Sequence, residues 1–251
     1  MPYGLKVINT SGTVQVDETY RNLELISKTT ISTSAHGSSG GSAVMTGSHF
    51  TVTVTGGVNP IVATACSAEW VGLDGKGSSR SGSTFTFHFY CSGAAGTSVT
   101  VYVFDTPSTP STPSSNYGLE VKNAAGARCY NSGLKYLRVQ DILTFQVPTS
   151  WTYAAANSPW YFTRHASWAT YTYTTGRTYA AAFTLGLEIE AKTFNSGGST
   201  RGVGWMVIGA KCSSNTVDFR ECAYQYYNTS SWTYFNPGMR SQAFVLDVTN
   251  Y

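Results

Sequence analysis

The 251-residue sequence predicts an all-β protein made of two tandem antiparallel β-sandwich-like domains joined by a short Thr/Ser/Pro linker. Three observations predict this fold class. Short runs alternate between apolar and polar side chains, no stretch has sustained helical periodicity with caps, and the opening of the chain recurs after a proline-rich segment. Several short strands at close spacing, each with one apolar face, are typical of antiparallel sandwiches or barrels.

The first element is a hairpin, and it occurs twice. The opening MPYGLKVINTSGTVQV returns as SNYGLEVKNAAGARCY, and the two segments align without a gap. The motif residues Tyr3, Gly4, Leu5, Val7, Asn9 and Gly12 fall on Tyr117, Gly118, Leu119, Val121, Asn123 and Gly126, and further along Leu23 falls on Leu137. In each copy two apolar runs flank an Asn- and Gly-bearing connection, which predicts a hairpin whose Asn and Gly adopt positive φ angles. Two copies are too few for a solenoid, so the repeat predicts duplication of a domain or of its opening motif.

Further strands follow in each half. In the first half they are NLELISKTTIST, FTVTVTG, PIVATACS, TFTFHFYC and SVTVYVFD; in the second they are YLRVQDILTFQV, TYTYTT, FTLGLEIEA, VGWMVIGA, AYQYY and AFVLDV. Between the halves lies TPSTPSTPSSN, whose evenly spaced prolines favour an extended strut over a place in a sheet. The sequence therefore predicts one domain at 1–105, a linker at 106–116 and a second domain at 117–251.

The composition excludes several classes of protein. Only 12% of residues are charged and the net charge is +3, which is too weak and too dispersed for nucleic-acid binding. No apolar run approaches the roughly 18 residues that a membrane span requires, and the N-terminus lacks the pattern of a signal peptide. We expect synthesis in a cytoplasm, no membrane insertion, and free thiols at the five cysteines. Pairing of Cys66 with Cys91 or of Cys212 with Cys222 stays open at this point.

Catalytic patterns are weak, and we expect no enzyme, cofactor or metal. GSSGG around Ser39 formally satisfies the nucleophile motif but stands in a loop-like context rather than between a strand and a helix. The four histidines have no metal-binding spacing, and His88 is expected on a solvated sheet face. Glu188 and Glu190 share one strand face, without the opposed geometry that glycoside hydrolysis needs.

The aromatic residues suggest recognition instead. Aromatics make up 14% of the chain, including 17 Tyr. Trp and Tyr combine a flat apolar ring with a polar tip, so they stack on sugars and anchor protein interfaces. Two segments are richest in them, and their members are the predicted ligand or receptor contacts, with core packing as the alternative: Trp151, Tyr153, Trp160, Tyr161 and Trp168 in the first, and Tyr227, Trp232 and Tyr234 in the second.

The repeated YGL-V-N--G motif resembles the opening hairpin of small β-rich tail-tip or tail-fibre-type virion proteins of tailed bacteriophages. The residues that carry the resemblance are Tyr3, Gly4, Leu5, Asn9 and Gly12, repeated as Tyr117, Gly118, Leu119, Asn123 and Gly126. It covers about 25 residues per copy.

The resemblance implies a structural virion component that contributes to host attachment. Its partners would be other tail proteins, further copies of the chain as a homo-oligomer, and a host surface glycan or protein. The first half is expected to dock on the tail and the second to face outward. Two alternatives remain: a capsid or collar decoration protein without a ligand, and a carbohydrate-binding or carbohydrate-active sandwich.

Overall fold

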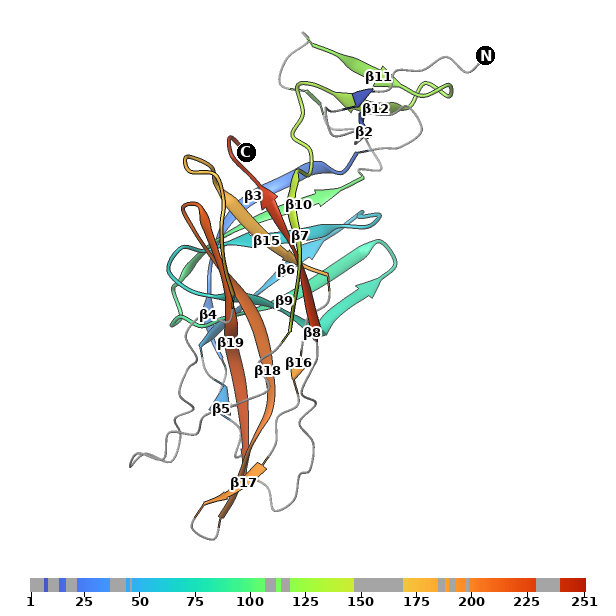
Figure 1. Cartoon of the computed structure of the whole chain (residues 1–251). Helices are drawn as coiled ribbons and strands as arrows, with labels where there is room; N and C mark the ends of the chain where they lie inside the picture. The colour runs from blue at the N-terminus through green and yellow to red at the C-terminus, as the bar shows by residue number, and fades with distance from the viewer. Residues whose placement is uncertain are drawn as a thin grey trace.

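The protein is described by a computed structural model at residues 7–8, 14–16, 22–36, 44–45, 47–106, 112–113, 118–146, 169–184, 188–189, 193–196, 199–228 and 240–251. Within these ranges all 20 elements are strands and all their pairings are antiparallel (Figure 1). The predicted all-β, antiparallel, sandwich-like fold is confirmed. The described residues include no helix that is long and apolar enough to cross a membrane.

Six strands form the first sheet. In spatial order they are β13 (Val139–Gln146), β20 (Arg240–Asp247), β15 (Tyr179–Phe183), β7 (Ile61–Ala65), β10 (Ser98–Asp105) and β3 (Glu24–Ser32). Their sequences alternate or are continuously apolar, as in SVTVYVFD of β10, because strands inside a sandwich bury one or both faces.

Ten strands form the second sheet. Its main path is β14 (Ala169–Thr172), β19 (Thr216–Asn228), β18 (Ser199–Ser213), β8 (Val71–Ser81), β9 (Thr84–Cys91), β6 (Ser48–Val54) and β4 (Ser34–Ala35). Three short strands lie off this path: β16 (Glu188–Ile189) and β17 (Thr193–Ser196) pair with β18, and β5 (Val44–Met45) pairs with β19.

Three larger apolar clusters stabilise these sheets, beside a small one around Val207 and Cys222. One lies between the sheets in the first half, where Phe50 and Phe89 stack within a set of buried valines. A second lies between the sheets in the second half, around Phe219 and Val245. A third cluster, with Phe104 and Leu246 at its centre, draws on strands of both halves. Burial of apolar area on this scale is the main source of stability in such a fold.

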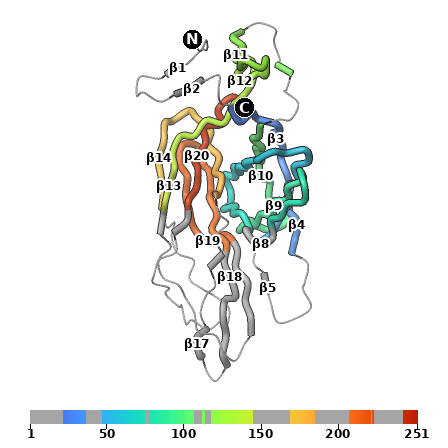
Figure 2. Tube along the Cα trace, turned by 90° about the vertical axis from the view of Figure 1, so that its right-hand side faces the viewer, coloured from blue at the N-terminus to red at the C-terminus, as the bar shows by residue number. Residues whose placement is uncertain are grey.

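Both sheets are shared between the two predicted domains, so the structure does not confirm a two-domain arrangement divided at 106–116. In the first sheet β7 and β15 pair through Thr64 and Ala181, and in the second β8 and β18 pair through Val71 and Ala210. Figure 2 shows the sandwich strands of the second half, such as β13, β19 and β20 in yellow-green to red, side by side with the blue to teal strands of the first half.

The strand order is the same when it is read from either edge. The first sheet runs β3–β10–β7 from one edge and β13–β20–β15 from the other, and in the second sheet β6–β9–β8 corresponds to β14–β19–β18, with β4 added beyond β6. Three strands of each half therefore take equivalent positions in each sheet, and the second sheet has short additional strands. The chain is duplicated throughout its sandwich, and the two copies are joined edge to edge by an approximate twofold relation.

A bulge at the same position supports this equivalence. The pairing of β3 with β10 skips Ile26, and the pairing of β13 with β20 skips Gln140. These two residues occupy the same position when the repeats are aligned on their opening motif. A bulge bends its strand at a fixed place, so its recurrence indicates that the two halves share local geometry beyond strand order.

Two glycines let the halves approach at the junction in the second sheet. A Cβ atom at Gly209 would lie 2.8 and 2.9 Å from backbone atoms of Val71, and a Cβ at Gly72 would collide with the carbonyl oxygen of Ile208. Glycine inside a strand commonly marks such a close backbone approach. The backbone N–H of Cys212 also donates to the carbonyl of Cys66 across the junction, at 2.9 Å.

All five cysteines are buried, and none is joined in a disulfide. Burial, together with the neighbouring Cys66, raises the pKa of Cys212 to about 12. Burial likewise raises the pKa of Cys91. Buried thiols with raised pKa values are poor nucleophiles, which agrees with packing rather than chemistry as their role.

Candidate binding surface around the second hairpin

The repeated motif forms two hairpins with the same register. β1 (Val7–Ile8) pairs with β2 (Val14–Val16), and β11 (Glu120–Lys122) pairs with β12 (Arg128–Asn131). In each pair the register shifts immediately after the motif valine, at Val7 in the first copy and Val121 in the second. The predicted duplication of the hairpin is confirmed at the level of backbone pairing.

The turn of the second hairpin gives two motif residues, Asn123 and Gly126, a structural role. Asn123 Oδ1 accepts hydrogen bonds from the backbone N–H groups of Ala125 and Ala127, at 3.0 and 2.9 Å. Gly126 has a φ of 78° and donates to the carbonyl of Asn123 at 2.9 Å. A positive φ was predicted for both residues; that prediction is correct for Gly126 and wrong for Asn123, which acts through its side chain.

The start of this hairpin is fixed by Ser132. The backbone N–H of Leu119 donates to Ser132 Oγ, and the N–H of Ser132 donates to the carbonyl of Leu119, both at 2.9 Å. Gly118 has a φ of 141°, and the space that its Cβ would fill is taken by Ser132 Oγ. The side chain of Leu119 itself is 46% exposed.

The second hairpin is held against the beginning of β3 from the first half. Arg128 and Glu24 form an ion pair at 3.6 Å with both side chains largely buried. Asn22 Nδ2 donates to the carbonyl of Cys129 at 3.3 Å, and Tyr136 forms a bridge with Glu24. Residues of the first half therefore hold the hairpin of the second half in place.

The repeats also meet at equivalent leucines. The backbone N–H of Leu137 donates to the carbonyl of Leu23 at 2.9 Å, and Leu25 N–H donates to the carbonyl of Lys135 at 2.7 Å. Leu23 and Leu137 are aligned residues of the two copies, and both pack on the cluster around Phe104. A contact between equivalent residues is what a twofold relation produces.

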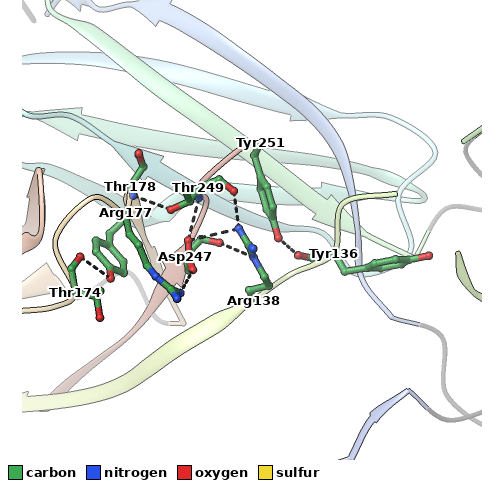
Figure 3. Close-up of polar contacts among 9 residues, drawn as sticks. Tyr136, Arg138, Thr174, Arg177, Thr178, Asp247, Thr249 and Tyr251 are labelled. Carbon is green, nitrogen blue, oxygen red and sulfur yellow. Dashed lines mark hydrogen bonds and ion pairs between the residues drawn. The ribbon is translucent and has the colours of Figure 1, made fainter. Parts of the chain in front are cut away.

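Asp247 anchors the surface beneath the hairpin (Figure 3). Its carboxylate forms ion pairs with Arg177 at 2.5 Å and Arg138 at 3.4 Å, and accepts from the backbone N–H of Thr249 at 3.0 Å. The Arg138 guanidinium also lies 4.6 Å from the ring centre of Tyr251. Burial alone would raise the pKa of Asp247, but the Thr249 hydrogen bonds and the two guanidinium groups outweigh it and hold the pKa below its ordinary value.

A groove of about 370 Å³ lies between this anchor and the hairpin. It is lined by Asn22, Tyr130, Leu134, Lys135, Tyr136, Leu137, Arg138, Thr249, Asn250 and Tyr251. Tyr130 and Tyr136 stack with ring centres 5.0 Å apart. The described lining residues supply aromatic rings, amides and cations. Its chemistry suits stacking and polar contact with a bound partner.

The predicted contact residues fall in two aromatic segments. Trp151, Tyr153, Trp160, Tyr161, Trp168, Trp232 and Tyr234 lie outside the described residues, as does the side chain of Tyr227 in β19. The two aromatic segments nevertheless connect to neighbouring strand ends. Gln146, the last residue of β13, pairs with Arg240, the first residue of β20. Their attachment points are therefore adjacent.

Of the other positions singled out in the sequence, several lie outside the described residues and His88 lies within them. Tyr3, Gly4, Leu5, Asn9, Gly12 and Tyr117 of the motif lie outside the described residues, as do Ser39 and Glu190. His88 lies on β9, where its Nδ1 is 3.2 Å from the hydroxyl of Thr51 in an exposed contact. This agrees with its predicted place on a solvated sheet face.

Two side-chain clusters were missed in the sequence because their members are distant in the chain. His36 stacks on His49 and on Tyr90, with ring centres 4.7 and 5.1 Å apart. Desolvation by burial, and then the charge of His49, lower the pKa of His36. The described residues contain no group of three or more His, Cys, Asp or Glu side chains that could hold a metal.

The second missed cluster surrounds Trp70. The guanidinium of Arg220 lies 3.2 Å from the ring centre of Trp70, and the ammonium of Lys211 lies 4.7 Å from it. Both cations come from the second half and the ring comes from the first, so these cation–π contacts add to the junction between the halves.

Comparisons with protein-family models, with curated proteins and with solved structures give no match to the chain.

Proposed function

We propose that this protein is a non-catalytic structural component of a bacteriophage tail, at the tail tip or fibre, and that it contributes to attachment of the virion to the host surface. The resemblance of the repeated YGL-V-N--G motif to such proteins motivates this function. The aromatic rings, amides and cations that line the groove beside the second hairpin suit contact with a bound partner.

The observation that carries the proposal is that the two ends of the β13–β20 strand pair carry different features. The β13–β20 pair begins at Val139 and Leu246, next to Arg138 and Asp247 beneath the hairpin. It ends at Gln146 and Arg240, where the aromatic segments attach. Seven residue steps of about 3.3 Å separate these ends by about 23 Å. A protein that docks at one end and adheres at the other needs this separation.

We therefore assign docking to the hairpins and adhesion to the aromatic segments. This replaces the division of roles between two halves, because the halves share both sheets. Weak aromatic contacts with a host glycan or protein become effective when several copies act together, which favours a homo-oligomer in a symmetric assembly.

The test of location is mass spectrometry of purified particles combined with immunogold labelling. We expect the chain in tails separated from heads, with label at the distal end of the tail. Label on the head or neck would favour a decoration or collar protein instead. Absence of the chain from purified particles would reject the proposal.

The test of adhesion uses purified full-length chain and host cells. Replacement of Trp151, Trp160 and Trp232 by Ala is expected to reduce cell binding at least tenfold, because stacking area is lost. Ile142→Ser is the control, since it removes an exposed apolar side chain from β13 outside the aromatic segments. Equal binding by the triple variant and the wild type would contradict the adhesive role.

A further inference from the structure

We infer that the groove between β3 and β6 is a docking site for an extended segment of a partner protein, which lies along the edge of β3 and inserts a tyrosine side chain between the two sheets. This groove shares no lining residue with the groove beside the second hairpin. The docking is therefore independent of the proposed function, and it adds a second binding surface together with the chemistry that the surface recognises.

The groove between β3 and β6 has a volume of about 320 Å³ and lies at the side of the sandwich in the first half. Part of its lining is apolar and buried, because three of its valines belong to the cluster around Phe50: Val52, Val54 and Val103. Another part consists of hydroxyl-bearing side chains, which include Ser27 and the exposed Thr29. The groove therefore leads from a hydroxyl-bearing rim to the apolar interior.

The duplication gives this groove a counterpart in the second half. Val62 of β7 corresponds to Ala181 of β15, because each pairs with the residue two positions before the aspartate that ends β10 or β20. Val54 stands eight residues before Val62, and Tyr173 stands eight residues before Ala181. Val54 at the end of β6 and Tyr173 just after β14 therefore occupy equivalent positions.

Four lining positions carry larger side chains in the second half. The replacements, first half to second, are Val52 to Tyr171, Val54 to Tyr173, Ser27 to Asp141 and Thr29 to Leu143. Tyr171 and Tyr173 pack on the cluster around Phe219, and the Tyr173 hydroxyl donates to Asp141 Oδ2 at 3.2 Å. Leu143 is buried beside them, whereas Thr29 is exposed. The groove of the first half is therefore the space that tyrosine side chains fill in the second half.

The occupant that fits this space is an aromatic side chain with a hydroxyl group. Its ring would bury apolar area against Val52 and Val54, as a buried aromatic ring does in a protein core. Its hydroxyl would find a hydrogen-bond partner in Ser27, which stands where Asp141 accepts from Tyr173. The second half thus supplies the chemistry of the occupant from within its own chain, and the first half needs it from a partner.

The edge of β3 determines the conformation of the segment that carries this ring. β3 is the last strand of the first sheet and pairs with β10 along its inner side. The beginning of its outer side already holds an added segment, because Leu25 N–H donates to the carbonyl of Lys135 and Leu137 N–H donates to the carbonyl of Leu23. Beside residues 27–32 the described part of the chain places no further strand. An extended segment that continues this pairing would add a strand to an open sheet edge, a common mode of peptide recognition.

The experiment measures binding of a synthetic peptide to the full-length chain by isothermal titration calorimetry. The probe is the capped pentapeptide TYTYT, which has the sequence of residues 170–174 and carries the two tyrosines of the second half. The comparison peptide is TSTST, in which serine replaces both tyrosines. A third ligand, p-cresol, offers the phenol ring without a peptide.

Two variants close the groove in different ways. Thr29→Trp covers it from the rim, and Thr30→Trp is the matched control, because Thr30 is also exposed but lies on the opposite face of β3 and does not line the groove. The double variant Ser27→Asp/Val54→Tyr fills the groove with the side chains of the second half. Thermal unfolding of each variant checks that it folds, and Thr29→Trp decides the test if the double variant does not.

We expect the wild type to bind TYTYT about tenfold more tightly than TSTST, because the rings bury apolar area that serine lacks. Thr29→Trp and the double variant should lose this preference, and Thr30→Trp should keep it. Equal affinity of the wild type for the two peptides, or an unchanged preference in Thr29→Trp, would overturn the inference.

Two other occupants are separate outcomes of the same test. If p-cresol binds as tightly as TYTYT, the groove recognises a small phenol and the strand contact is refuted. If sedimentation shows that the wild type is a dimer that Thr29→Trp dissociates and Thr30→Trp does not, the occupant is a second copy of this chain and the partner protein is refuted. A wild type that keeps its mass in Thr29→Trp while the variant loses the preference for TYTYT supports the inference.

Discussion

The two halves of this protein share one plan but stabilise it with different chemistry. Asp105 and Asp247 end the last strand of each half and are both buried. In the first half the carboxylate accepts from the backbone N–H groups of Val58, Asn59 and Thr106, at 2.9, 2.9 and 2.7 Å. In the second half it accepts one backbone N–H, that of Thr249, and is paired with the side chains of Arg138 and Arg177. The comparison teaches that duplication has preserved the buried acid while its partners were free to change.

The largest expected effect is at the junction, which both halves need. Gly72→Ala and Gly209→Ala should each lower the free energy of unfolding by about 2–4 kcal/mol, because the new methyl group meets backbone that cannot move aside. Urea unfolding measures this.

Gly126→Ala is the control for these two variants. Gly126 has a positive φ but open space around its Cβ position, so the cost should be about 1 kcal/mol. If all three variants had the same stability, the close approach at the junction would not be a determinant of folding.

The next effect distinguishes the two buried acids. Asp105→Asn should lower the free energy of unfolding by about 2–3 kcal/mol. The backbone N–H groups of Val58 and Asn59 cannot reach water instead, and one of them would lie against the N–H group of the new amide. Asp247→Asn should cost only about 1 kcal/mol, because the side chains of Arg138 and Arg177 are nearly half exposed and regain solvent. A larger cost for Asp247→Asn in urea unfolding would show that the arginine partners matter more than the backbone donors.

Acid titration sharpens the same comparison. The pKa of Asp247 is lowered in the folded state, so its contribution to stability is present above the unfolded pKa of about 3.9 and is lost as pH falls through the folded value. We expect the loss of stability below pH 4 to be shallower in Asp247→Asn than in the wild type. Parallel curves would contradict the lowered pKa.

The smallest effect concerns His36, in the first half. Its folded-state pKa is lowered, so the unfolded chain binds the proton first, and stability should fall as pH decreases below about 6.5. Urea unfolding at pH 7.5 and 5.5 should show a smaller difference for His36→Gln than for the wild type. An unchanged pH difference in His36→Gln would contradict the lowered pKa of His36.

The sequence predicted what local pattern determines and missed what distant strands determine. Alternation in segments such as FTVTVTG identified strands, and the repeated Asn and Gly identified the hairpins. The two halves share sheets through strand pairs such as Thr64 with Ala181, and no pattern in the sequence predicts which strands pair. The glycines Gly72 and Gly209 did indicate the junction, because glycine within a strand is typical of a close backbone approach. The stack of His36 on His49 arises when β4 pairs with β6. The sequence around these two residues has no pattern that predicts their contact.

The central claim is that the two halves form one body through shared sheets. It is tested most directly by replacing residues 107–111 with a specific protease site, cutting the folded protein there, and measuring its mass in solution. We predict that the two pieces stay together as a particle of about the intact 27.0 kDa and separate only in denaturant. Separation into two folded pieces in native buffer would contradict the claim.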